Sequence, residues 1–458
     1  MSLSVAINPI EKKYKFPTWL FLYLLILSGF GYGGLIEIIG DIAIGPFFFR
    51  PIDIIFFVSV FSFGIYLFRK RSSYLPNSYT MAALLFIYFV VYYLLADKSS
   101  IGSVGMITSV LSFVVLYYVG RSSISYKDIY NLDVIAQLGL ILFFIIFVSN
   151  LIGIYHGSVT ILPDTQFYTL RDEIFTRRQG LILQFFPALS LGFNLGALLL
   201  HRISLKEKLL RIILIMMFIF SLDISFRGNY LFISGVIILT FFFMKHRGKK
   251  IGLIRIFIPS VVSIILLLLF LQEYGRNTLG INNLVQAQFS RVSDLFFALD
   301  GQGDLNAASN SRTIIWLYAL NLILVDPLKF LFGHGFLLFV EISPLFNVNP
   351  HNFIIESILI LGLVGFTLLM VFIWLPIIKV ATKLEKQIRN IDYADVLIFA
   401  VYILQIKFLI ALFTQSAFFE RDIMIFFYAS CGILFSVYNS FILIKHSLET
   451  TKVNVKEN

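Results

Sequence analysis

The chain has 458 residues, of which 59% are hydrophobic and only 14% are charged. Soluble domains carry about a quarter of charged residues, so this composition excludes an ordinary soluble protein and indicates a polytopic membrane protein. The formal net charge is +10, and the one cysteine, Cys431, excludes an internal disulfide and a cysteine cluster for a metal.

Apolar runs of about 20 residues recur along the whole chain, and each could cross a hydrocarbon core about 30 Å thick as a helix. The runs do not alternate apolar and polar residues, as the strands of a membrane β-barrel would. We therefore predict an all-α polytopic membrane fold with about twelve transmembrane helices. The predicted spans are 17–40, 51–68, 79–96, 101–120, 133–154, 181–200, 212–226, 229–244, 256–272, 352–378, 394–415 and 423–444.

The spacing of these runs predicts three parts. Residues 1–272 hold helices 1 to 9 with short loops, 273–351 form a large outer loop, and 352–458 hold helices 10 to 12 and a cytoplasmic tail. A structureless loop as long as the second part is uncommon in a compact protein, so we expect short amphipathic helices in it. The clearest candidate runs from Arg312 to Val325.

Basic residues are unevenly distributed between the two predicted sides of the membrane. If the N-terminus is cytoplasmic, about two thirds of the lysines and arginines fall on the inner side, which predicts that both termini are cytoplasmic. The net charge is then mainly topological, and we expect no nucleic-acid partner. Arg178, Arg227 and Arg312 depart from the pattern on the outer side, where a cationic surface suits an anionic substrate.

Arg227 and Arg312 are candidates for binding an anion. Arg227 lies in a polar interruption between two short spans, and an arginine at that depth costs at least a few kcal/mol unless it meets an anion, a carboxylate or water. The planar guanidinium binds phosphate oxygens in pairs, so two converging arginines would suit a pyrophosphate. The simpler alternatives are that Arg227 pairs with Asp223 and that Arg312 anchors its helix to lipid headgroups.

Pro350-His351-Asn352 precedes the tenth predicted span, and nine residues separate it from Gly362-Leu363-Val364-Gly365. Asn352 is suited to cap the helix, and capping is the simpler interpretation of the motif. A histidine at a helix start can also accept a proton from a hydroxyl group near neutral pH, which makes His351 a candidate catalytic residue. We expect Gly362 and Gly365 to permit close helix packing rather than to contact a substrate.

His334 and Lys407 are further candidates. His334 stands between Gly333 and Gly335, and Lys407 lies inside the eleventh predicted span, where it could pair with an acid, reach the interface or line a substrate cavity. The sequence has no HExxH motif and no carboxylate pair with histidine at helical spacing. We therefore expect neither a metal nor another cofactor.

These motifs resemble the O-antigen polymerase and O-antigen ligase superfamily of bacterial inner-membrane glycosyltransferases. The matching residues are Ser311-Arg312 before a helix containing Trp316, then Pro327, Gly333-His334-Gly335, and His351-Asn352 with nine residues before Gly362-x-x-Gly365; earlier in the chain they are Ser225-Phe226-Arg227-Gly228 and Arg178-x-Gly180 with Pro187. The resemblance covers about residues 178–365. Phe226 departs from the family, which commonly has serine directly before the arginine.

The resemblance implies a GT-C-like architecture in the bacterial inner membrane, with the active site and the large loop facing the periplasm. The implied reaction transfers a glycan from undecaprenyl pyrophosphate to an acceptor. Arg227 and Arg312 would hold the donor pyrophosphate and His351 would activate or orient the acceptor hydroxyl. Further possible substrate-binding residues are Arg178, His334 and Asn352 in the region of the resemblance and Lys407 outside it. The implied partners are the undecaprenyl-pyrophosphate-linked oligosaccharide, membrane lipids and a chain-length regulator protein.

The acceptor separates the two activities of this superfamily. We prefer a polymerase, which uses another lipid-linked repeat unit, because the polymerases tend to be longer and more divergent. A ligase would instead transfer the glycan to lipid A-core or to a protein. A lipid-linked oligosaccharide flippase is the alternative of a different class, although its charges should line a path at mid-depth rather than gather at the outer side.

Overall fold

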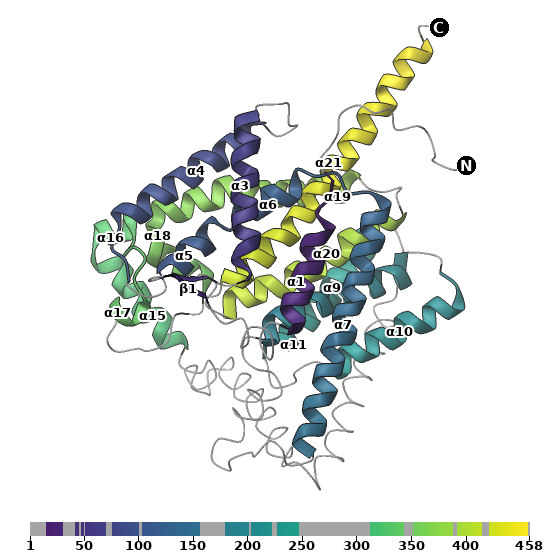
Figure 1. Cartoon of the computed structure of the whole chain (residues 1–458), viewed down its shortest axis with the longest axis horizontal. Helices are drawn as coiled ribbons and strands as arrows, with labels where there is room; N and C mark the ends of the chain where they lie inside the picture. Colours follow the sequence, from purple (N-terminus) through teal and green to yellow (C-terminus); the bar gives the residue numbers. More distant parts are fainter. Residues whose placement is uncertain are drawn as a thin grey trace.

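The computed structural model describes residues 15–30, 42–44, 47–49, 51–69, 76–99, 103–155, 179–200, 203–221, 227–246, 312–342, 350, 352–387, 392–414 and 421–456. These residues are mainly helical (Figure 1). The elements are α1 (Thr18–Phe30), β1 (Ile42–Ile44), β2 (Phe47–Phe49), α3 (Asp53–Arg69), α4 (Pro76–Leu95), α5 (Ser103–Leu111), α6 (Phe113–Gly120), α7 (Tyr126–Tyr155), α9 (Gln179–Leu200), α10 (Leu205–Phe220), α11 (Arg227–His246), α15 (Arg312–Val325), α16 (Pro327–Phe332), α17 (Phe339–Ile342), α18 (Phe353–Leu369), the π-helical turn η2 (Met370–Trp374), α19 (Leu375–Gln387), α20 (Asp392–Thr414) and α21 (Arg421–Lys456).

The helical prediction is confirmed with one local exception. Strands β1 and β2 pair antiparallel, with Ile42 opposite Phe49, in the stretch between the first and second predicted spans, 17–40 and 51–68. Helix α1 covers Thr18–Phe30 of the first predicted span, and residues 31–40 of that span lie outside the described residues. The predicted helix from Arg312 to Val325 is present as α15 with the same bounds.

Five segments within the described residues are long and apolar enough to cross a membrane. They are Ser103–Gly120, Tyr126–Ile145, Phe353–Leu384, Ala394–Leu412 and Ile423–Ile442. Shorter apolar helices accompany them, and several expose large apolar side chains, such as Leu84 and Leu94 of α4, as lipid-facing helices do. These features indicate a multi-pass membrane protein. They do not establish the predicted count of about twelve spans, and the predicted span 256–272 lies outside the described residues.

Helix α20 lies between α9, α11 and α21, and α21 in turn packs against α5, α6 and α19. The contact between α9 and α20 is made through Gly192 and Gly196, where the sequence reads G-x-x-x-G. A Cβ atom on Gly192 would lie 2.4 Å from the Cα atom of Ala400. Small residues at this spacing let two membrane helices approach to backbone contact.

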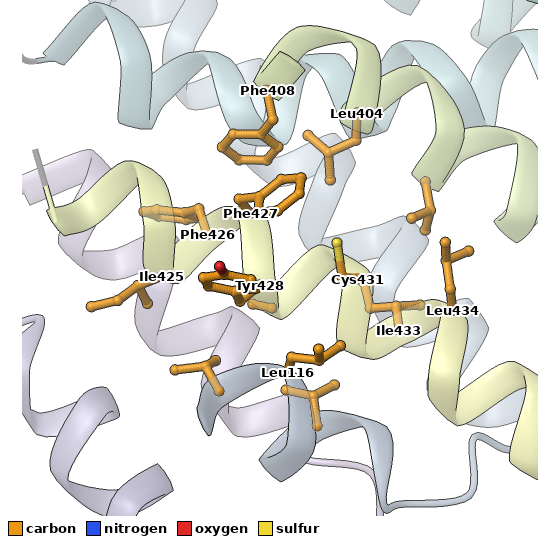
Figure 2. Close-up of a cluster of buried hydrophobic side chains, with 14 of the residues drawn as sticks. Leu116, Leu404, Phe408, Ile425, Phe426, Phe427, Tyr428, Cys431, Ile433 and Leu434 are labelled. Atoms are coloured by element: carbon orange, nitrogen blue, oxygen red, sulfur yellow. The ribbon is translucent and has the colours of Figure 1, made fainter. Parts of the chain in front are cut away.

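Apolar side chains from α6, α20 and α21 form the centre of the bundle (Figure 2). Phe408 of α20 packs against Phe427 of α21, with ring centroids 6.1 Å apart. Cys431 is buried among them as a free thiol. We call this apolar interior of α6, α9, α20 and α21 the bundle core.

A buried polar network joins α7, α9 and α10. Arg211 of α10 donates two hydrogen bonds to the carboxylate of Asp133 on α7, at 3.0 and 2.7 Å, and a third to the Asn194 side chain on α9 at 3.1 Å. Gln137 and Ser190 complete the network through hydrogen bonds to Asp133, Asn194 and each other. Arg211 therefore has a structural role in fixing three helices.

Candidate functional site

The start of α15 is held beside the start of α18. Trp316, four residues after Arg312, donates a hydrogen bond from its indole Nε1 to the Pro350 carbonyl oxygen at 2.5 Å. Trp316 lies in the second turn of α15, directly after the turn that begins with Arg312. The first turn of α15, which begins with Arg312, is therefore brought to the residue that precedes His351 in the sequence. His351 itself and the side chain of Arg312 lie outside what the structure describes.

Helix α15 runs alongside the first part of α18 in the same direction. Six buried apolar residues join the two helices to α17: Ile315, Ala319, Ile323, Phe339, Ile355 and Leu359. We call this set the small core. At one end Trp316 of α15 contacts Pro350. At the other end His334 contacts the backbone of Leu322 on α15 and of Leu359 on α18, so both helices begin at the same end. Two helix N-termini at one place favour a negatively charged group there.

Asn352 caps α18. Its side-chain oxygen accepts hydrogen bonds from the backbone N–H groups of Ile354 at 3.0 Å and Ile355 at 3.3 Å. The capping interpretation is confirmed, and the side chain is only partly exposed. The cap fixes the direction in which the chain leaves Pro350 and His351 and enters the helix.

Helix α18 is broken at Gly362, which has φ 67° and ψ 177°. Only glycine adopts this conformation without strain. The predicted tenth span, 352–378, is therefore not one continuous helix but two arms, Phe353–Leu361 and a second arm that begins at Leu363. The motif glycine was expected to permit close packing, and it does so, but it also ends one helical arm and starts another.

The two arms of α18 fold toward each other. The ring centroids of Phe353 and Trp374 are 5.2 Å apart. A straight helix rises about 1.5 Å per residue and would separate these two positions by about 30 Å, far more than two side chains can bridge. The chain therefore makes a sharp V at Gly362. The start of α18 is thereby placed against Trp374, whose ring also stacks on Phe427 of α21 at 4.9 Å.

The point of the V rests on the turn after α16. A Cβ atom on Gly362 would lie 2.3 Å from the Leu331 carbonyl oxygen, and one on Gly333 would lie 2.3 Å from the Ile360 carbonyl oxygen. The hydroxyl of Tyr92 on α4 lies 2.5 Å from the Phe332 carbonyl oxygen and 2.8 Å from that of Ile360. Backbone-to-backbone contact, secured by one tyrosine from the bundle, therefore fixes this junction.

His334 belongs to the same junction. Its backbone N–H donates to the Leu359 carbonyl oxygen at 2.7 Å. Burial lowers the pKa of the imidazole and the positive charge of Lys329 lowers it further, while a hydrogen bond to the Leu322 backbone opposes the shift. The imidazole Nε2 atom is buried and has no hydrogen-bond partner in the described part of the chain. His334 thus favours a neutral imidazole that packs between α15 and α18.

Lys407 is buried in α20, with 7% of its surface exposed, and faces α11. Its Nζ atom lies 5.2 Å from the ring centroid of Phe232. The ring of Phe243, further along α11, packs at 5.1 Å on that of Phe399, which is earlier in α20. The two helices are therefore antiparallel, and the start of α11, where Arg227 lies, is level with the part of α20 beyond Lys407.

The structure does not describe the side chains of two further sequence candidates, Arg178 and Arg227. Arg178 lies outside the described residues, and only the backbone of Arg227, at the first position of α11, is described. Within the described ranges, no group of three or more histidine, cysteine, aspartate or glutamate residues could hold a metal ion.

Sequence reasoning missed two residues in this region. Glu356, in the first turn of α18, is 1% exposed, and it is the one charged residue between Glu341 and Lys379. Trp316 was noted only as part of an apolar helix, and its bond to Pro350 was not anticipated. A lone carboxylate in an apolar run was the available signal for Glu356, whereas nothing local predicts the partner of Trp316.

The fold and this geometry define a multi-pass helical membrane protein in which two helix starts meet at the edge of the bundle. The model of one protein family, O-antigen ligase, matches residues 192–370. This match supports the resemblance of the motifs to the O-antigen ligase and polymerase superfamily. A comparison with curated proteins finds no match.

The matched region extends from α9 to the end of α18 and contains Arg227, Arg312, His334, His351 and Asn352. Lys407 and Arg178 lie outside it. Members of this family are glycosyltransferase-like enzymes that act on lipid-linked oligosaccharides. The small core and the V of α18 both fall within the matched residues.

Proposed function

We propose that the protein is an O-antigen polymerase. It would transfer a glycan from undecaprenyl pyrophosphate to the terminal sugar of a second lipid-linked repeat unit, at the periplasmic face of the bacterial inner membrane and without a metal. The observation that carries this proposal is the hydrogen bond from Trp316 to the Pro350 carbonyl. It brings the helix that starts with Arg312 to the chain that leads into His351.

The proposed chemistry is a displacement at the anomeric carbon of the donor glycan. His351 would accept the proton of the acceptor hydroxyl as its oxygen forms the new glycosidic bond. The bond from the anomeric carbon to the pyrophosphate oxygen breaks, and the lipid pyrophosphate leaves as an anion. Arg227 and Arg312 would stabilise the charge that develops on this leaving group, an effect that is strongest in a water-poor site.

The arrangement of α15 and α18 supports these roles. Both helices begin at the end where Arg312 and His351 fall in the sequence, so their N-terminal dipoles would add to the arginine charge on a bound diphosphate. Arg178, His334 and Asn352 would then have secondary roles. We assign Asn352 to capping and His334 to packing at the junction, because the described contacts of both residues are structural.

A ligase is the second candidate, and the match to the O-antigen ligase family model favours it. The two are distinguished by the purified protein reconstituted with lipid-linked repeat units, with and without a lipid A-core acceptor. We expect ladders of repeats on the lipid carrier when no core is present. Product that forms only on the core would replace the polymerase proposal with the ligase. Movement of repeats across the membrane with no new glycosidic bond would indicate a flippase.

Removal of the proposed base and of one proposed arginine tests the roles directly. His351→Ala and Arg312→Ala should each abolish transfer while the protein still inserts and purifies as the wild type does. Full activity of His351→Ala would remove the base assignment.

A chelator should leave the rate of glycan transfer unchanged. A loss of activity that magnesium or manganese restores would contradict the metal-independent mechanism.

A further inference from the structure

We infer that α15 and α16 lie within one leaflet of the membrane, and that the hydrocarbon chains of the bilayer lipids cover their exposed apolar side. The sequence predicted these residues as part of a large outer loop with amphipathic helices. This placement holds for a polymerase and for a ligase alike, so it goes beyond the proposed function. Three features carry it: the composition of α15, the continuity of its surface with that of α4, and the position of the nearby charges.

Helix α15 is apolar on two sides. One side contributes residues to the small core. The other side exposes large apolar side chains, which are Ile314, Leu317, Leu320, Leu324 and Val325. From Thr313 to Val325 the sequence has no charged residue, and Asn321 is the one exposed polar residue in that stretch. A helix that lies on a protein surface in water has a polar side opposite its buried side, so this composition indicates contact with lipid.

The length of α15 restricts how it can meet the membrane. Its 14 residues rise about 21 Å, which is less than the hydrocarbon core of about 30 Å. Helix α16 follows directly and also exposes apolar side chains, with Leu328 68% and Phe332 51% exposed. The pair therefore suits one leaflet and not a full crossing.

The exposed surface of α16 continues the lipid-facing surface of α4. Along α4 the exposed apolar side chains recur at helical spacing, at Leu84, Ile87, Val91, Leu94 and Leu95. The end of α4 touches the end of α16, because the Tyr92 hydroxyl bonds the Phe332 carbonyl oxygen and the Phe336 N–H donates to the Asp97 carbonyl oxygen at 2.8 Å. Figure 1 shows α16 beside the end of α4. Lipid that covers α4 would therefore also reach α16 and α15.

Charged side chains stand where these two surfaces meet. Lys98, just after α4, donates from Nζ to the Leu94 carbonyl oxygen at 3.2 Å. The Nζ atom of Lys329 on α16 lies 3.6 Å from an Asp97 carboxylate oxygen. Lysines near the ends of membrane helices keep their apolar stems in lipid and their ammonium groups at the headgroups. We therefore place the headgroups at Lys98 and Lys329 and the hydrocarbon chains over the exposed leucines.

The test measures what surrounds the exposed side of these helices. Leu317→Cys, Leu324→Cys and Leu328→Cys each receive a nitroxide spin label, and the purified proteins are reconstituted in vesicles of phosphatidylethanolamine and phosphatidylglycerol. Collisions of the label with oxygen, which concentrates in lipid, are compared with collisions with a water-soluble nickel complex.

Three positions serve as controls. Leu84→Cys on α4 reports a lipid-facing side chain, and Lys98→Cys reports a side chain at the level of the headgroups. Cys431 is fully buried, so the wild type should take up no label. If the wild type is labelled, the variants are made in the Cys431→Ser background.

We expect the ratio of oxygen to nickel collisions at the three leucine positions to match that of Leu84→Cys and to exceed that of Lys98→Cys. A ratio that favours nickel would place α15 and α16 in water and overturn the inference. Few collisions with either reagent would also overturn it, since another part of the chain or a second copy would then cover these side chains.

A second measurement needs no substitution. The wild type is placed in vesicles whose phospholipids carry a photoactivatable diazirine on the acyl chain, and the adducts are mapped by mass spectrometry. We expect adducts on 312–332 as well as on α4, whereas adducts on α4 without any on 312–332 would overturn the inference. Neither measurement uses glycan transfer, so a failure of the polymerase proposal and a failure of this placement are observed separately.

Discussion

The bundle core and the small core hold their helices together by different means. In the bundle core, α9 and α20 approach to backbone contact over Gly192 and Gly196, and aromatic side chains from three helices fill the interior. The small core has six buried apolar residues and is joined to the rest by hydrogen bonds to backbone carbonyls and by paired glycines with positive φ. Apolar side-chain packing tolerates adjustment, whereas hydrogen bonds to backbone carbonyl groups and glycines with positive φ do not. The proposed site is therefore carried by the part whose geometry is more strictly defined.

The largest effect is expected where the small core meets the bundle. Gly362→Ala places a Cβ atom 2.3 Å from the Leu331 carbonyl oxygen in a backbone conformation that alanine does not adopt. We expect a loss of about 3 kcal/mol or more of local stability and of about 100-fold or more in glycan transfer. Limited proteolysis of 312–362 together with a transfer assay would measure both.

Gly365→Ala is the matched control, because Gly365 belongs to the same motif but its nearest neighbours are side chains, Leu361 and Phe89. A Cβ atom on Gly365 would lie 2.7 Å from the Leu361 Cβ atom, but Gly365 lacks the positive φ of Gly362, so this variant should lose less stability and activity than Gly362→Ala. Equal losses in the two variants would contradict the special role given to Gly362.

A second prediction concerns the bundle. Arg211→Met leaves the buried Asp133 carboxylate without its cation, and we expect destabilisation of about 3 kcal/mol, read as a fall in the thermal unfolding temperature in detergent. The double variant Asp133→Leu with Arg211→Met should recover much of this loss. The KM for donor should stay at the wild-type value in the folded fraction, because the network lies outside the small core.

A third prediction tests whether Trp316 positions the chain that precedes His351. Trp316→Phe keeps the apolar contact but removes the donor to the buried Pro350 carbonyl oxygen. We expect kcat to fall about tenfold at nearly unchanged KM for the donor, since the chain before His351 loses one fixed point. Trp19→Phe in α1, where the indole is 45% exposed, is the control. Identical kinetics for Trp316→Phe and the wild type would dismiss this role.

The smallest predicted effect is a pH dependence of the junction. Because burial lowers the pKa of His334, the folded state favours the neutral imidazole. This contribution to stability is complete above the ordinary histidine pKa of about 6.5 and is lost as the pH falls through the lowered folded value. The unfolding temperature of the wild type should therefore decline on acidification more than that of His334→Gln. Parallel declines in the two proteins would reject the prediction.

Much of the helical fold can be predicted from residue patterns. The apolar runs predict helices, Asn352 predicts a cap, and Arg312 to Val325 is a helix with the expected bounds. These features depend on neighbouring residues, whose preferences can be read locally. The pairing of strands 42–44 and 47–49 and the break at Gly362 were not predicted. Short apolar runs suit helix and strand alike, and the sequence does not give the φ angle of a single glycine.

The site was predicted in part for the same reason. Motif residues mark Arg312 and His351, but the bond from Trp316 to Pro350 joins positions 34 residues apart and depends on how α15 packs. The position of Lys407 over Phe232 depends on the register of two helices far apart in the chain. Contacts between residues far apart in the chain cannot be predicted from neighbouring residues. Lys407 could therefore be recognised only as an unusual charge in an apolar run.

The fold of α18 also explains why nine residues separate Asn352 from Gly362. The chain just before this arm is held by the indole of Trp316, and the end of the arm is held by Gly333. The length of the arm must therefore match the distance between these two contacts. One residue more or less would change its length by about 1.5 Å and turn one end by about 100° relative to the other. The nine-residue spacing of the motif therefore sets the length of the helical arm between Asn352 and Gly362.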